Sequence, residues 1–143
     1  MKKTFYYCLI ILLLATIAIS KKAKRWETKN NIIIMDNQNY KEIIGSYKNV
    51  MVLFYVPFCS RTDALMSMYQ RVYNKYYKKK ASIKFAKINT YANKEFSSLL
   101  NLRGYPAIYL FRGNLEERMP FESEPTFYDF KSFIDIHLYH KIR

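Results

Sequence analysis

Residues 49–62, NVMVLFYVPFCSRT, contain the features that decide the fold of this chain. Residues 50–56 form an apolar run without polar alternation, which is typical of a strand buried on both faces of a sheet. Pro57 has no amide proton to donate to a neighbouring strand, so it ends the run. Cys59 follows, and a long amphipathic segment begins at Ser60. We therefore expect a cysteine at the start of a helix, where amide groups and the helix dipole favour thiolate over thiol.

The remaining sequence predicts alternating strands and helices in one domain. Runs of β-branched residues and alternating apolar residues predict strands, and apolar residues at helical spacing predict helices. Gly113 lies in a turn expected to join the last two strands as a hairpin. Short right-handed connections make the early strands parallel and leave this hairpin as an antiparallel edge. The sequence thus predicts an α/β three-layer sandwich, with a central mixed sheet flanked by helices. The expected strands cover residues 32–35, 50–56, 83–88, 107–111 and 117–121, and the expected helices cover 40–47, 60–79, 92–100 and 125–138.

The N-terminal segment is typical of a secretory signal peptide. Two lysines precede an apolar run at residues 5–19, and small residues near its end suit a cleavage site. The run is short for a bilayer span, which needs about 20 residues. An uncleaved membrane anchor is the alternative, because basic residues follow at once and slow translocation. We expect a signal peptide or anchor at residues 1–20, a basic linker at 21–30 and one folded domain at 31–143.

Cysteine usage leaves one thiol in the expected domain. The sequence has two cysteines, and removal of Cys8 with the signal peptide would leave Cys59 alone. Secretion places a protein in an oxidising compartment, where thiols ordinarily pair. Cys59 is therefore free, paired with another molecule, or reactive.

The formal net charge is +13, and the basic residues are spread along the chain. The one dense cluster, Lys75 with residues 78–80, lies at an expected helix end, where cations are favourable. We therefore expect no nucleic-acid partner, and contact with a membrane only if the N-terminal segment stays uncleaved. The alternative is a basic surface that docks on anionic lipid or nucleic acid, with binding that falls steeply with salt.

Motifs for metals and cofactors are lacking in the sequence. His137 and His140 lie three residues apart, but no other His or Cys is near them in sequence, so we expect no metal site. Neither a phosphate-binding loop nor a Ser/His/Asp arrangement is found, and no cofactor is expected.

Four segments, in the right order and spacing, resemble the thioredoxin-fold proteins of the protein disulfide isomerase group. Residues 54–59, FYVPFC, are similar to that group's FYAPWC, and residues 59–62, CSRT, lie over its CGHC. Residues 83–88 resemble the strand after the active-site helix, and residues 103–106, RGYP, are similar to RGYPT. The resemblance implies a thioredoxin fold and thiol–disulfide exchange in the endoplasmic reticulum lumen or elsewhere in the secretory pathway.

The resemblance also implies a substrate-binding surface. It implies that Pro106 is a cis proline packed beside Cys59. In the family, the backbone just before this proline pairs with an extended client peptide. Tyr105, Pro106 and Phe58 are therefore the expected substrate-binding residues.

Departures from the family pattern limit the chemistry. Thr62 stands in place of the second cysteine, and Leu53 stands where these enzymes keep a buried glutamate that helps to move protons. We expect Cys59 to be the catalytic thiol, supported by Arg61 and Thr62. It would form mixed disulfides with thiol- or disulfide-containing clients, to capture or isomerise them, with glutathione or a dithiol oxidoreductase as a possible releasing partner.

One thiol cannot complete a dithiol redox cycle alone, so we expect weak protein disulfide isomerase-type activity and no autonomous oxidoreductase. A second interpretation stays open. Cys59 is then a relic in a catalytically degenerate domain that binds peptides or belongs to a larger assembly.

Overall fold

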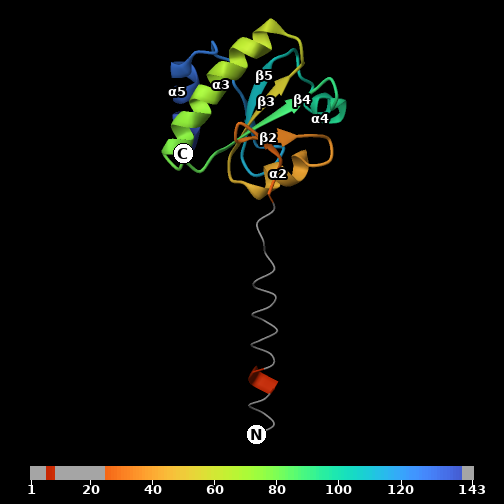
Figure 1. Cartoon of the computed structure of the whole chain (residues 1–143), viewed down its shortest axis with the longest axis vertical. Coiled ribbons are helices and arrows are strands. Elements are labelled where there is room, and N and C mark those ends of the chain that lie inside the picture. The colour runs from red at the N-terminus through yellow and green to blue at the C-terminus, as the bar shows by residue number, and fades with distance from the viewer. Residues whose placement is uncertain (1–5, 9–24, 140–143) are drawn as a thin grey trace.

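A six-stranded mixed sheet forms the centre of the computed structural model, which describes residues 6–8 and 25–139 (Figure 1). The strand order is β1-β2-β4-β3-β5-β6. β2 and β3 both run parallel to β4, whereas β5 is antiparallel to β3, β6 to β5, and β1 to β2. The strands are Thr28–Lys29 (β1), Ile32–Met35 (β2), Val50–Tyr55 (β3), Lys84–Asn89 (β4), Ala107–Phe111 (β5) and Arg118–Pro120 (β6).

Helices cover both faces of the sheet and complete the three layers (Figure 1). α3 and α5 pack on one face, and α2 and α4 pack on the other. This arrangement confirms the predicted α/β fold class and the antiparallel hairpin at the edge. The helices are Tyr40–Ser46 (α2), Ser60–Lys78 (α3), Lys94–Leu99 (α4) and Phe127–Tyr139 (α5).

The central strand β3 is buried on both faces, as its unbroken apolar sequence predicts. Met51 and Leu53 pack in the core beneath α3 and α5, while Val52 and Phe54 pack beneath α2 and α4. All four side chains are fully buried. β3 ends at Tyr55, so the residues that follow are free to form the connection to α3.

A buried phenol fixes α3 on the sheet. The Tyr69 hydroxyl lies 2.6 Å from the carbonyl oxygen of Met51 and 2.9 Å from that of Ala86. Complete burial raises the pKa of Tyr69 well above its ordinary value, so the group stays a neutral phenol whose single proton is shared between these two backbone oxygens. A helix fixed in this way holds its first turn at a constant position relative to β3.

A second tyrosine fixes α3 to α5. The Tyr76 hydroxyl donates to Asp135 Oδ1 at 2.7 Å, and Lys131 Nζ lies 2.5 Å from the other carboxylate oxygen. Desolvation, reinforced by Asp135, raises the pKa of Tyr76. The two helices on this face are therefore joined by polar contacts as well as by apolar packing.

Most expected boundaries differ by one or two residues from those of the structure, and two of the differences have a clear cause. Residues 28–29, expected in the linker, form β1 because they pair with Ile33 and Ile32. α5 begins at Phe127 rather than at Pro125, because Thr126 caps it: the Asp129 amide donates to Thr126 Oγ1 at 3.2 Å.

The expected signal peptide or anchor lies outside the described residues, apart from residues 6–8, and so do residues 21–24 of the expected linker. Within the described part of the chain, no helix combines the length and the apolar character needed to cross a bilayer.

Candidate functional site

Cys59 lies at the N-cap of α3, where the sequence places it. Its backbone is extended, with φ −116° and ψ 118°, and the residue is half-buried. The preceding residue, Phe58, has a left-handed backbone with φ 58° and a fully exposed side chain, at 104% of the reference area. This conformation costs an L-residue about 1–2 kcal/mol. The connection thus holds an aromatic ring in solvent beside the cysteine.

The first turn of α3 favours the thiolate form of Cys59. The backbone N–H of Thr62 has the largest effect in lowering the pKa of the Cys59 thiol, followed by the Thr62 hydroxyl. Desolvation opposes these two effects, and the backbone N–H and the positive charge of Arg61, each with a smaller effect than desolvation, lower the pKa further. Unpaired amide groups at a helix N-terminus stabilise an anion in this way. The start of α3 therefore favours ionisation of the Cys59 sulfur, which is the effect expected of a cysteine at a helix N-terminus.

Thr62 is buried, and its hydroxyl is poorly satisfied. The residue is 4% exposed, and Oγ1 has no conventional hydrogen-bond partner among the described residues. A buried hydroxyl without a partner costs about 1–3 kcal/mol. The same hydroxyl lowers the pKa of Cys59, so it can donate a hydrogen bond to the ionised sulfur. A threonine oxygen can donate to this sulfur, but it cannot displace a partner from it.

The expected substrate-binding residues lie at the same end of the sheet. The Tyr105–Pro106 peptide bond is cis, and Tyr105 is exposed. Both residues line a groove of about 520 Å³ between α3 and the start of β5, with Arg61 on its α3 wall. The groove is otherwise mainly apolar, with Leu65, Met68 and Phe121 among its lining residues.

This groove brings together only some of the predicted site residues. Arg61, Tyr105 and Pro106 line it, whereas Cys59, Thr62 and Phe58 do not. Cys59 lies two residues before Arg61 in the chain but is not among the residues that line the groove.

A buried lysine beneath α3 is a feature that the sequence argument missed. Lys87 on β4 is 8% exposed and pairs in register with Leu53 of β3. Its Nζ lies 4.0 Å from Met66 Sδ, and it forms no ion pair with any described residue. Desolvation, with a contribution from Lys29, lowers the pKa of Lys87. The side chain thus faces a leucine at the position where the resemblance expects a glutamate.

Strand periodicity could have revealed Lys87. The apolar and polar residues of 83–88 suggest a strand with one buried face, but β4 is buried on both faces. In a strand, Lys87 falls on the same face as Phe85, two residues before it. The available signal was a charged residue on the strand face that carries Phe85.

The histidines give no support for a metal centre. Within the described residues, no group of three or more His, Cys, Asp or Glu side chains is placed to hold a metal ion. His137 Nδ1 is buried without a hydrogen-bond partner, and burial lowers the pKa of its imidazole. His140, the other half of the pair considered from the sequence, lies outside the described residues.

Comparison with known proteins agrees with this geometry. The family model described as Thioredoxin matches residues 31–135. This chain belongs to the thioredoxin family. The match covers the whole sheet from β2 onward, together with Cys59 and the Pro106 loop.

Among curated members of the family, the chain is similar to protein disulfide-isomerases. It is 28% identical over 108 residues to protein disulfide-isomerase of Drosophila melanogaster, a match covering 76% of this chain and 22% of that protein. It is 26% identical over 111 residues to protein disulfide-isomerase of Ricinus communis, a match that also covers 76% of this chain and 22% of that protein. The chain therefore spans about a fifth of the length of these relatives.

Solved thioredoxin-family structures share the fold. The first thioredoxin domain of mouse protein disulfide-isomerase A4 superposes with a TM-score of 0.72 at 14% identity, covering 87% of this chain and 88% of that domain. The zinc-bound form of human ERp44 superposes with a TM-score of 0.66 at 18% identity, covering 72% of this chain and 30% of that protein.

Proposed function

We propose that this protein is a monothiol member of the protein disulfide isomerase group, which forms mixed disulfides with client proteins through Cys59. The observation that carries the proposal is a half-buried cysteine at the mouth of α3 whose pKa is lowered by Thr62 and Arg61. The similarity to protein disulfide-isomerases supports thiol–disulfide exchange as the reaction class. Arg61 and Thr62 are the supporting residues of the proposed site.

The proposed reaction needs one thiol from this protein. The Cys59 thiolate attacks one sulfur of a client disulfide, forms a new S–S bond, and releases the other client sulfur as a thiolate. That thiolate, or another thiol of the same client, later attacks the mixed disulfide and regenerates Cys59. The client disulfide is rearranged with no net oxidation or reduction. Glutathione or a dithiol oxidoreductase would release clients that lack a free thiol.

The proposed substrate surface is the aromatic and apolar end of the groove. Tyr105 and Pro106 would contact the client backbone by strand addition, while Phe58 would cover the client next to its sulfur. The resemblance supports this assignment, because extended peptides bind before the corresponding proline in the family.

The proposed setting is the lumen of the endoplasmic reticulum or a later secretory compartment. In this proposal residues 1–20 are a signal peptide or anchor, 21–30 are largely a linker and 31–143 are the active domain. The protein disulfide-isomerase relatives support this setting.

Non-reducing electrophoresis of the native full-length chain tests the proposal. Mixed disulfides appear as bands of higher mass that collapse on reduction, and these bands are lost in Cys59→Ala. Cys8→Ala is the matched control, because it removes the other cysteine and leaves the bands in place. Bands that persist in Cys59→Ala, or depend on Cys8, contradict the proposal.

A thiol-independent peptide-binding module is the second candidate function. It is favoured by one observation: the groove beside Pro106 is lined without Cys59. Peptide binding that is undiminished in Cys59→Ala, with no mixed disulfide in the wild-type chain, supports this candidate over the first.

A further inference from the structure

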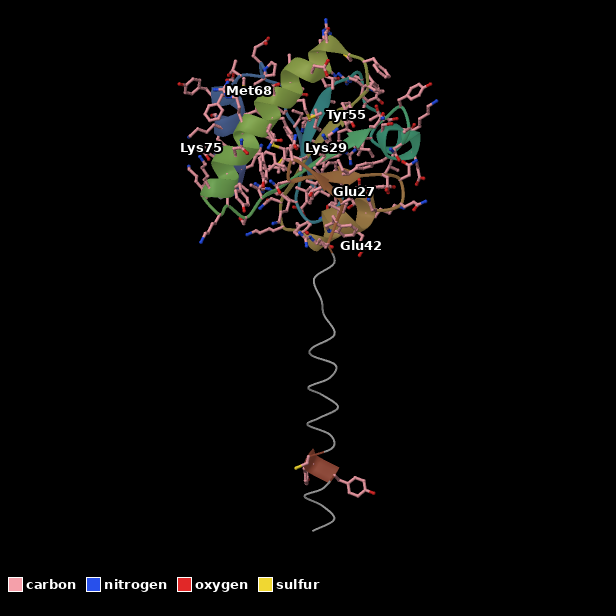
Figure 2. The ribbon with its side chains drawn as sticks, in the orientation of Figure 1. Glu27, Lys29, Glu42, Tyr55, Met68 and Lys75 are labelled. Atoms are coloured by element: carbon pink, nitrogen blue, oxygen red, sulfur yellow. The ribbon has the colours of Figure 1, made fainter. Side chains whose placement is uncertain are left out.

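A separate cleft lies at the opposite end of the sheet from Cys59. It has a volume of about 830 Å³ and is bordered by the C-terminal end of α3, the start of β4 and the segment after α2. Cys59 precedes the first residue of α3, and a helix of 19 residues is about 28 Å long. In Figure 2, Tyr55 at the end of β3 lies in the upper half of the domain, whereas Glu27 and Glu42 lie in the lower half. This cleft is therefore not part of the thiol site.

The charged lining of the cleft is entirely cationic. Arg25, Lys78, Lys80 and Lys84 line it, and no Asp or Glu of the described residues does. None of these four side chains forms an ion pair with another described residue. Unneutralised cations around a concave, low-dielectric surface create a positive potential that attracts anions.

Aromatic rings form the walls of the same cleft. Tyr73 and Tyr77 are stacked, with centroids 5.6 Å apart and an interplanar angle of 26°. Tyr47 lies on another wall, and Lys84 Nζ is 5.4 Å from its ring centroid. Trp26 also lines the cleft. Tyr77 is exposed, whereas the other three aromatic residues are partly buried, and an exposed aromatic ring offers a stacking surface for a planar ligand.

We propose that this cleft binds a phosphorylated aromatic ligand of the mononucleotide class. The cations would hold the phosphate groups, and the tyrosine rings would stack on the base. The volume falls within the range of about 300–1,000 Å³ of small-ligand sites, which favours a compact ligand over a polymer or a bilayer. The aromatic walls favour a ligand with a ring over phosphate alone. This inference is independent of the function proposed for Cys59.

Trp26 provides a direct readout of this cleft. It is the only tryptophan in the sequence, so intrinsic tryptophan fluorescence reports on this site alone. Titration of the full-length chain with ADP is expected to give a saturable fluorescence change. The affinity falls as added salt screens the lysines.

Matched charge variants test where the ligand binds. Lys78→Gln with Lys80→Gln removes two cations from the cleft, and we expect ADP affinity to fall by about tenfold. Lys75→Gln with Lys79→Gln removes the same charge from the same helix end, but neither residue lines the cleft and Lys79 lies over the Tyr76 ring. This control pair is expected to weaken binding by less than about twofold.

Ring and lipid controls decide the ligand class. Tyr77→Ala truncates an exposed side chain and is expected to weaken ADP binding without changing that of inorganic tripolyphosphate. The proposal is overturned if ADP gives no saturable fluorescence change. It is also overturned if the two double lysine variants lose the same amount of ADP affinity. Tripolyphosphate that binds as tightly as ADP also overturns it, as do phosphatidylserine vesicles that bind at this site and are not displaced by ADP.

Discussion

At the scale of single residues, Thr62 combines a cost in stability with a benefit to chemistry. Its hydroxyl is buried without a conventional partner and lowers the pKa of the neighbouring thiol. A group that is poorly satisfied until Cys59 ionises is typical of a functional site rather than of optimised packing.

Thr62→Val separates these two effects. Because valine has nearly the same shape but no hydroxyl, we expect the Cys59 pKa to rise while the free energy of unfolding is unchanged or increases by about 1 kcal/mol. The pKa stays lowered in part, because the backbone N–H of residue 62 remains. The pH dependence of alkylation by iodoacetamide and urea denaturation measure the two quantities. Ser67→Ala, an exposed change on the same helix, is the control. An unchanged alkylation profile would contradict the role given to the hydroxyl.

Lys87 makes the stability of the fold depend on pH. Its folded pKa is lowered from the ordinary lysine value of 10.5, so the unfolded chain binds this proton more tightly. The contribution of Lys87 to the free energy of unfolding therefore increases with pH between its folded pKa and the ordinary value of 10.5.

Lys87→Met removes this contribution. Replacing a buried, unpaired charge by an apolar side chain of similar length is expected to leave the free energy of unfolding unchanged or raise it by about 1 kcal/mol near neutral pH. Urea denaturation at a series of pH values measures both effects, with Lys84→Met as an exposed control on the same strand. If wild type and Lys87→Met show the same slope with pH, the lysine is not a buried cation in the folded state.

At the scale of elements, α3 depends on the sheet for its position. The Tyr69 hydroxyl, fully buried, contacts the backbone of both β3 and β4. We expect Tyr69→Phe to reduce the free energy of unfolding by about 1–2 kcal/mol. Tyr77→Phe, which removes the same hydroxyl from an exposed ring on the same helix, should change it by less than about 0.5 kcal/mol. Chemical denaturation measures both variants, and equal effects would show that the buried hydroxyl does not anchor the helix.

The same elements indicate how far sequence reasoning reaches. β3 and α3 follow from their hydrophobic patterns, because each pattern is long and regular and tertiary contacts reinforce it. The pairing of residues 28–29 with β2 was not predictable, because two polar residues have no periodicity and the pairing depends on where β2 lies. Lys87 was missed because strand alternation predicts only the face of the sheet on which a side chain lies. Its burial depends on α3, which covers that face. The cationic cleft was missed because its residues come from four segments that only the fold brings together.

At the scale of the whole molecule, the two ends of the sheet carry different chemistry. The end at Cys59 has an exposed aromatic ring, an apolar groove and a thiol whose ionisation is favoured. The other end has unneutralised cations and stacked tyrosines. The cations are therefore distributed unequally between the two clefts: Arg25, Lys78, Lys80 and Lys84 line the second cleft, whereas the groove near Cys59 is lined by a single cation, Arg61.

The most direct test of the account is the titration of the Cys59 thiol in the native full-length chain. Alkylation by iodoacetamide across a pH series, with Cys59 and Cys8 resolved by mass spectrometry of their peptides, gives the pKa of each thiol. We predict a Cys59 pKa below the free-thiol value of about 8.5. A Cys59 pKa at or above that value would contradict the proposal that α3 and Thr62 hold this sulfur ready for disulfide exchange.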